Sequence, residues 1–372
     1  MKIWANSADS HFVEPMDVFR DHLPAELAER LPRSEKDSAG EYETIFVDGR
    51  SFRRKMPSRT RDEFLRTFPS PGGIRDARQR IVDNDGEGVW AEVVYPSMGL
   101  WNGMIRDPRL AREAARVAND WAIAEIQSVS PRLLPTAEIS LLSMDDAAAE
   151  IERVADLGMR GVFLPTRPPA AVDLYNRDSW EPVWDAAETS GMVICFHIGT
   201  DTVDPTVADS QVVFRGPGGA VLNYVETSYG GQRAVAQMVT SGALDRHPGL
   251  TVLVSEGGAS WVPFLGDRMN EAYRQHGAAV QPKLSMEPKQ FLYRQVYTSF
   301  QHDVSAITAL TGDGYRNVMW GSDYPHLEGT YGHTQKTLHE LFDDQPVEVR
   351  ERITQGAFEE LFPGVPPVPV AA

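Results

Sequence analysis

Carboxylate and imidazole side chains stand at the ends of four short apolar runs. Asp9 and His11 end the first run, and His197 ends another. Glu256 and Asp323 follow two more. Ionised carboxylates that met in one place would repel each other and would have shifted pKa values. A divalent cation removes that cost, and neutral imidazoles can complete its coordination. If these chain ends meet in the fold, the residue types predict a metal site.

Each of these residues also has an ordinary structural explanation. An Asp or Glu after a strand often caps the next helix, and a single His is more often structural than a ligand. The combination favours the metal site. Asp9 and His11 support it further, because residues two apart on an extended chain point to the same side.

Three other residues extend the predicted site. Glu14 follows the first run and is a candidate sixth ligand. His302 follows another apolar run, and His326 comes three residues after Asp323, so both are expected to touch substrate as acids or bases. Asp323 or Glu256 is expected to accept the proton of an activated water.

The apolar runs alternate with segments of helical spacing. Asp107-Pro108 begins one helix, because Pro is favoured at the first helical position, and further helices are expected at 143–157, 179–190 and 260–273. Alternation of strands and helices predicts parallel βαβ units. Eight such units predict an α/β fold, a (β/α)8 TIM barrel with its active site at the C-terminal ends of the strands. The expected strands lie near 3–9, 89–95, 134–139, 160–164, 192–197, 251–255, 296–299 and 317–322.

Three connections, at 17–80, 199–228 and 274–293, are too long for simple barrel loops. We expect one barrel domain over residues 1–362, with an insertion at 17–80 after the first strand and a loop at 199–228 after the fifth. Connections of this length are usually functional covers or small subdomains. Residues 363–372 form a Pro-rich tail.

The composition limits the partners. The 372 residues carry a formal net charge of −17, which disfavours binding to nucleic acid or to an anionic membrane. The single cysteine, Cys195, allows neither an intrachain disulfide nor a Cys-rich zinc module. The first nine residues lack the apolar stretch of a signal peptide, and we expect a cytoplasmic protein that binds a small-molecule substrate. A homodimer is one assembly left open.

Several motifs carry a resemblance to a known family. They are Asp9-Ser10-His11, His197, residues 242–248 leading into 252–258, and residues 320–325. With these motifs the chain resembles the amidohydrolase superfamily, in the amidohydrolase-related branch that includes aminocarboxymuconate-semialdehyde and γ-resorcylate-type decarboxylases. The resemblance implies a (β/α)8 barrel and a divalent metal held by Asp9, His11, His197 and Asp323.

The chain departs from that family pattern at two positions. Val13 and Glu256 stand where many relatives have histidines. Four carboxylates and two imidazoles are the ligand inventory of dinuclear iron and manganese centres on another fold. Oxygen-rich ligation also favours Fe or Mn over Zn. One alternative is therefore a dinuclear site, and the other is a single Fe, Mn or Zn ion with Glu14 in a turn and Glu256 as a base.

These departures favour a metal-dependent hydrolase. A bound metal would activate water against an ester, a thioester such as an acyl-CoA, a lactone or an amide. The alternative is a metal-dependent, non-oxidative decarboxylase of an unsaturated or aromatic acid, which the overall resemblance supports. A third reading, a catalytically inactive barrel that only binds metal or partners, is disfavoured because candidate residues are present at all four strand ends.

Overall fold

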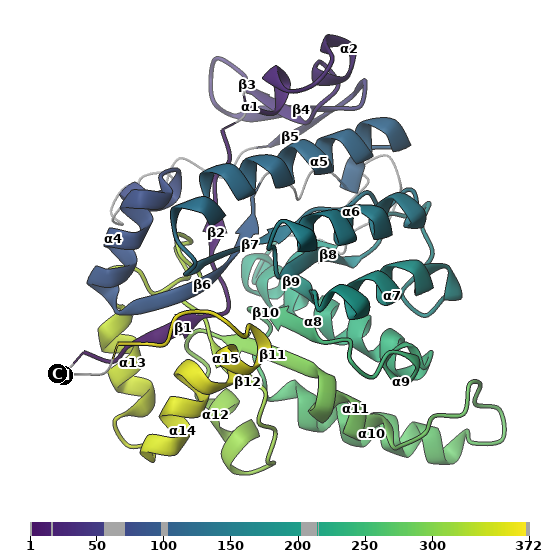
Figure 1. Ribbon diagram of the computed structural model, residues 1–372, viewed down its shortest axis with the longest axis vertical. Coiled ribbons are helices and arrows are strands. Elements are labelled where there is room, and N and C mark those ends of the chain that lie inside the picture. Colours follow the sequence, from purple (N-terminus) through teal and green to yellow (C-terminus); the bar gives the residue numbers. More distant parts are fainter. Residues whose placement is uncertain are drawn as a thin grey trace.

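The protein is built around a parallel sheet whose strands come from nearly the whole length of the sequence (Figure 1). The computed structural model describes residues 2–15, 18–55, 71–97, 103–201, 214 and 216–369. The sheet order is β1-β6-β7-β8-β9-β10-β11-β12, and β2 also pairs with β6. The strands are β1 (Ala5–Ser7), β2 (His11–Phe12), β6 (Val89–Pro96), β7 (Leu133–Ala137), β8 (Gly161–Arg167), β9 (Val193–Asp201), β10 (Val252–Ser255), β11 (Val296–Phe300) and β12 (Val318–Trp320).

The first and last strands close this sheet into a barrel. The backbone N–H of Ala8 donates to the carbonyl of Trp320 at 3.0 Å, and Ser10 forms a parallel bridge with Tyr324. With β1 and β2 as two parts of one barrel position, the strands occupy eight positions. The predicted (β/α)8 barrel is confirmed.

Helices surround the barrel between successive strands (Figure 1). The side chain of Asp107 caps α5 and that of Ser143 caps α6, at the starts expected from the sequence. No helix in the described part of the chain is long and apolar enough to cross a membrane. The helices are α1 (Val18–Asp21), α2 (Ala25–Ala28), α4 (Ala77–Glu87), α5 (Pro108–Glu125), α6 (Met144–Asp156), α7 (Glu181–Ser190), α8 (Gly219–Thr240), α9 (Ala243–Arg246), α10 (Trp261–Gln275), α11 (Pro288–Gln295), α12 (Val304–Thr311), α13 (Thr334–Phe342), α14 (Val347–Glu351) and α15 (Ala357–Leu361).

The barrel interior is a packed core at the end away from the predicted site. α15 closes that end, because Phe358 and Leu361 pack against side chains from the strands. The indole of Trp90 donates to the carbonyl of Pro366 at 2.8 Å, so the Pro-rich tail also lies against the barrel. The inward-facing strand residues in this core include Val93, Leu134, Phe163, Cys195, Leu253, Tyr297 and Met319.

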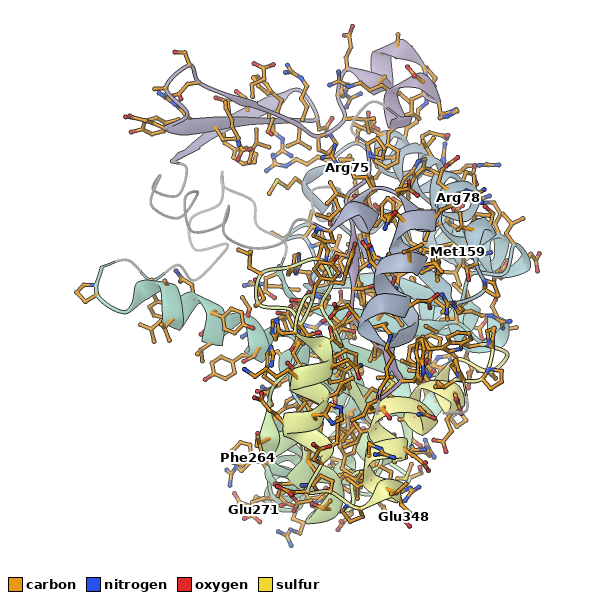
Figure 2. All side chains as sticks on the ribbon, turned by 90° about the vertical axis from the view of Figure 1, so that its left-hand side faces the viewer. Arg75, Arg78, Met159, Phe264, Glu271 and Glu348 are labelled. Atoms are coloured by element: carbon orange, nitrogen blue, oxygen red, sulfur yellow. The ribbon has the colours of Figure 1, made fainter. Side chains whose placement is uncertain are left out.

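The long first connection contains a small antiparallel sheet at one end of the molecule (Figures 1 and 2). Its strands are β3 (Arg33–Lys36), β4 (Tyr42–Val47) and β5 (Arg50–Lys55). Burial alternates along β4, as expected for a sheet with one covered face. Val47 packs with Leu27 and Leu110, which attaches the sheet to α2 and α5. Part of the predicted 17–80 insertion lies outside the described residues.

The predicted loop at 199–228 is wrong at both ends. β9 runs on to Asp201, and α8 begins at Gly219. The abundance of Gly and Thr in this stretch is typical of a loop. The helix is held by packing that follows this stretch, since Gly230 and Gly231 of α8 are buried against the barrel.

One buried ion pair joins the barrel to the loops that carry the predicted site. Arg80 of α4 pairs with Glu92 of β6, and both side chains are fully buried. The same guanidinium donates to the carbonyl of His11 at 2.6 Å and to that of Tyr324 at 3.5 Å. Arg80 therefore holds the backbone beside both His11 and Asp323.

Replacing Arg80 should destabilise the protein strongly. The substitution Arg80→Met leaves Glu92 buried without its counter-charge, a change that costs about 3–5 kcal/mol in other proteins. The free energy of unfolding from urea titration measures the loss, with Arg78→Met on the exposed face of α4 as the matched control. Equal stabilities for the two variants would contradict this role.

Candidate metal centre

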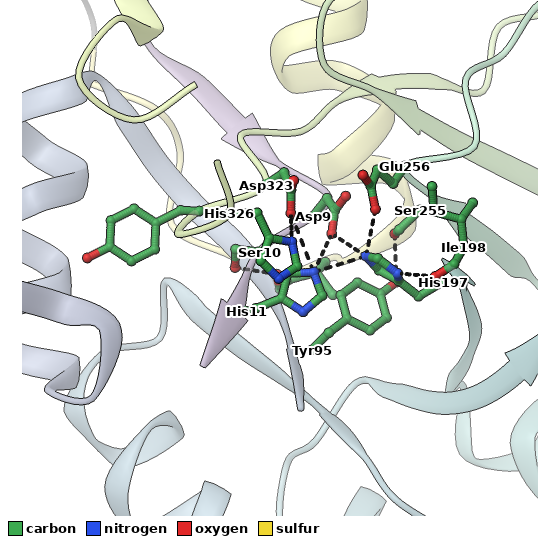
Figure 3. A network of polar contacts seen from close by, with 12 residues as sticks. Asp9, Ser10, His11, Tyr95, His197, Ile198, Ser255, Glu256, Asp323 and His326 are labelled. Carbon is green, nitrogen blue, oxygen red and sulfur yellow. Dashed lines mark hydrogen bonds and ion pairs between the residues drawn. The ribbon is translucent and has the colours of Figure 1, made fainter. Parts of the chain in front are cut away.

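The ends of four barrel strands bring carboxylates and imidazoles together at one mouth (Figure 3). The Nε2 atoms of His11 and His197 are 3.0 Å apart, and Nε2 of His197 lies 3.1 Å from Oδ1 of Asp9. Oδ1 of Asp323 lies 3.5 Å from Nε2 of His11, and Oε2 of Glu256 lies 3.6 Å from Nε2 of His197. Asp9, His11, His197, Glu256 and Asp323 therefore form one cluster at the mouth of the barrel.

The backbone is strained where two of these carboxylates enter the cluster. Glu256 has φ 63° and Asp323 has φ 51°, in the left-handed region that non-glycine residues rarely adopt. Hydrogen bonds hold both conformations: the N–H of Glu256 donates to Oγ of Ser299, and the N–H of Asp323 donates to the carbonyl of Asp9, each at 3.0 Å. Such strain gathers at functional sites, where the surrounding structure enforces it.

Burial opposes the charges that meet here. Burial, followed by the nearby Asp323 charge, raises the pKa of the Glu256 carboxyl well above its usual range. Burial also raises the pKa of Asp323. Burial and the neighbouring His197 lower the pKa of His11. Burial lowers the pKa of His197 as well, but Asp9 outweighs it and the net shift is upward.

The donor set fits a divalent cation. Nδ1 of His197 lies 2.8 Å from the carbonyl of Ile198 and donates to it, so Nε2, which faces Asp9, is the ring atom that would bind a cation. Metal-binding histidines usually have this arrangement. Oδ2 of Asp323 is buried and has no hydrogen-bond partner among the described residues. A cation between these atoms would use the free lone pairs and neutralise the crowded carboxylates.

Three overlapping groups have ligand atoms close enough to share an ion. Within each group the atoms lie within 4.8 Å of one another. The groups are Asp9 with His11 and His197, then His11 with Asp323 and His326, and Asp9 with Glu256 and Asp323.

His326 joins the cluster, whereas two other predicted residues lie outside it. Nδ1 of His326 is 2.7 Å from Oδ1 of Asp323, and its ring stacks on His11 at 4.1 Å between centroids. Glu14 instead accepts a hydrogen bond from the N–H of Ser97 at 3.0 Å and is in none of the three groups. His302 is exposed, with Nε2 3.3 Å from the carbonyl of Glu328.

Two residues that the sequence reasoning missed support the cluster. The ring of Tyr95 packs 4.9 Å from that of His197, and its hydroxyl lies 2.7 Å from Oγ of Ser255. The Gln301 amide donates to Oδ2 of Asp9 at 3.5 Å. Both residues follow the rule that identified the ligands, because each stands at the C-terminal end of a predicted strand.

Comparison with known proteins is consistent with this geometry. Residues 84–363 match the family described as Amidohydrolase. The chain is 23% identical over 269 residues to decarboxylase yanB of Aspergillus niger, covering 70% of this chain and 71% of that protein. It is 24% identical over 270 residues to the 6-methylsalicylic acid decarboxylase of Penicillium expansum, covering 70% and 78%.

Solved structures share the fold over nearly the whole chain. An amidohydrolase of Mycobacterium avium subsp. paratuberculosis has a TM-score of 0.77 at 19% identity, covering 97% of this chain and 99% of that one. The 5-carboxyvanillate decarboxylase LigW of Sphingomonas paucimobilis has a TM-score of 0.67 at 20% identity, with the same coverage. A dihydroxybenzoic acid decarboxylase of Polaromonas, solved with bound manganese, has a TM-score of 0.63 at 16% identity, covering 97% of each chain.

These comparisons correct the expected hydrolase activity, since both curated relatives are named decarboxylases. The hydrolase expectation depended on an excess of carboxylates over imidazoles. The structure places Glu14 outside the cluster and His326 inside it. The remaining balance is three carboxylates, Asp9, Glu256 and Asp323, and three imidazoles, His11, His197 and His326.

Metal retention should depend on the residues at the centre of the cluster. We expect Asp9→Ala and His197→Ala each to lose most of the bound metal, because each removes a donor that lies within 3.1 Å of another. Elemental analysis of metal per chain after dialysis measures this. His333→Ala, at an exposed histidine outside the three groups, is the control. Full metal retention in both cluster variants would show that the ligands lie elsewhere.

Proposed function

The chain belongs to the amidohydrolase family, and from that membership we propose that it is a metal-dependent decarboxylase of aromatic carboxylic acids. The observation that carries the metal dependence is the cluster at the strand ends, in which carboxylate and imidazole atoms lie close enough to share an ion. The names of the curated relatives support decarboxylation as the reaction.

The proposed ion is a single manganese held by Asp9, His11, His197 and Asp323, with Glu256 as a further donor. Mixed oxygen and imidazole donors without a thiolate suit manganese. A structural neighbour solved with bound manganese supports the same choice. When bound, the ion supplies positive charge that holds the substrate carboxylate and stabilises the electrons left on the ring.

Asp323 is the proposed proton donor. Decarboxylation breaks the bond between the ring and the carboxylate, releases CO2 and leaves the electron pair on the ring carbon, which must take up a proton. Asp323 stands at the mouth of the barrel beside the other members of the cluster, and Nδ1 of His326 lies next to its Oδ1. His326, partly exposed and 2.7 Å away, is placed to return a proton from solvent to Asp323.

The proposed substrates are benzoic acids with a hydroxyl next to the carboxylate. A ring hydroxyl donates electron density to the neighbouring carbon, which makes that carbon easier to protonate. A relative named 6-methylsalicylic acid decarboxylase supports this class.

The manganese-loaded protein should therefore convert at least one acid of this class to the arene. In D2O the product should carry one deuterium at the vacated carbon, which mass spectrometry detects. An enzyme that hydrolyses esters or lactones but decarboxylates no acid in a broad hydroxybenzoate panel would refute the proposal.

Substituting the proton donor should remove the activity. We expect Asp323→Asn to lower kcat by about 10²–10⁴-fold or more, the usual contribution of acid catalysis, because an amide cannot donate the proton to carbon. Asp303→Asn, at an exposed aspartate near the same mouth, is the matched control and should keep its rate. Equal rates for the two variants would remove Asp323 from the proposed mechanism.

A further inference from the structure

Helix α8 differs along its length in how it contacts the barrel. Its second half is buried, with Gly231, Ala234, Val235 and Met238 against the core. Its first half projects beyond the barrel, as Figure 2 shows for the teal helix at the side of the molecule. Five large side chains there are exposed: Val221, Leu222, Tyr224, Val225 and Tyr229.

Two glycines bring α8 very close to the strands that carry the cluster. A Cβ atom added at Gly231 would lie 2.4 Å from Cγ1 of Val254, and one added at Gly230 would lie 2.7 Å from Oγ1 of Thr166. Larger side chains at these positions would push the helix outward. The glycine pair therefore sets the distance from α8 to β8 and β10.

Helical geometry then directs Tyr224 toward the mouth of the barrel. Tyr224 precedes Gly231 by seven residues, which is about two turns, so both lie on the same helix face. The Tyr224 hydroxyl donates to Oε1 of Glu256 at 3.4 Å. The other oxygen of that carboxylate, Oε2, lies 3.6 Å from Nε2 of His197. Tyr224 thus contacts Glu256 on the side away from the imidazoles.

The carboxylate of Glu256 meets other negative charges in the cluster. Its ligand oxygen lies within 4.8 Å of those of Asp9 and Asp323, which repel it, and its backbone is held in a strained conformation. With Oε1 held by Tyr224, the carboxylate keeps Oε2 directed at the other donors.

The geometry points to Tyr224 as a positioning residue of the metal centre, which acts by holding Glu256 toward the ion. Tyr224 lies outside the barrel strands, on a helix that approaches because of Gly230 and Gly231. The inference rests on the proposed metal site and is independent of which substrate is decarboxylated.

A double-mutant cycle on manganese affinity tests this role. The dissociation constant for Mn²⁺ is measured without substrate for the full-length wild type, Tyr224→Phe, Glu256→Gln and the double variant. Outer partners of metal ligands typically contribute 10–100-fold in affinity, and this long hydrogen bond should give about 10-fold. We expect Tyr224→Phe to weaken binding by that factor, Glu256→Gln to weaken it further, and the double variant to match Glu256→Gln.

Tyr229→Phe is the matched control, since Tyr229 is 45% exposed on the same helix. It should bind Mn²⁺ as the wild type does. Wild-type affinity in Tyr224→Phe or in Glu256→Gln would overturn the inference, as would an equal loss from Tyr224→Phe with and without Glu256. Failure of the decarboxylase proposal would appear separately, as intact Mn²⁺ binding in a protein that decarboxylates no hydroxybenzoate.

Discussion

Mutual repulsion among buried carboxylates is the constraint on which this structure depends. Asp9 and Asp323 come from opposite ends of the chain, yet barrel closure fixes them together, because the N–H of Asp323 donates to the carbonyl of Asp9. Arg80 then anchors the backbone on both sides of this contact. Holding these like charges together lowers the stability of the fold, and a divalent cation between them would offset their repulsion.

Much of the fold follows from local patterns in the sequence. The alternation of apolar runs and helical segments predicted all eight strand positions, because each parallel strand is buried and some helices carry a start signal, as at Asp107 and Ser143. The start of α8 was missed, since Gly216, Gly218 and Gly219 at its beginning are typical of a loop, whereas the contacts of Gly230 and Gly231 with Thr166 and Val254 appear only in the folded protein. Position at a strand end also grouped five cluster residues, but not Glu14, which follows β2 and accepts a hydrogen bond from the N–H of Ser97.

Residue types at the site predict a metal more readily than a reaction. Carboxylates and imidazoles bind a divalent cation whether the next step is attack by water or loss of CO2. The difference lies in where a proton donor stands relative to the substrate carbon. In the proposed mechanism the pair of Asp323 and His326 supplies that proton, and their 2.7 Å contact is visible only once the chain is folded. Reasoning from the ligand inventory alone therefore led to the hydrolase.

The most direct test of the central claim is the position of the ion itself. Anomalous diffraction from crystals of the manganese-loaded protein locates manganese independently of any activity. The account predicts one strong peak between the side chains of Asp9, His11, His197 and Asp323, with metal–ligand distances of about 2–2.5 Å, the usual range for such donors. A strongest peak elsewhere on the molecule, with these four side chains unliganded, would contradict it.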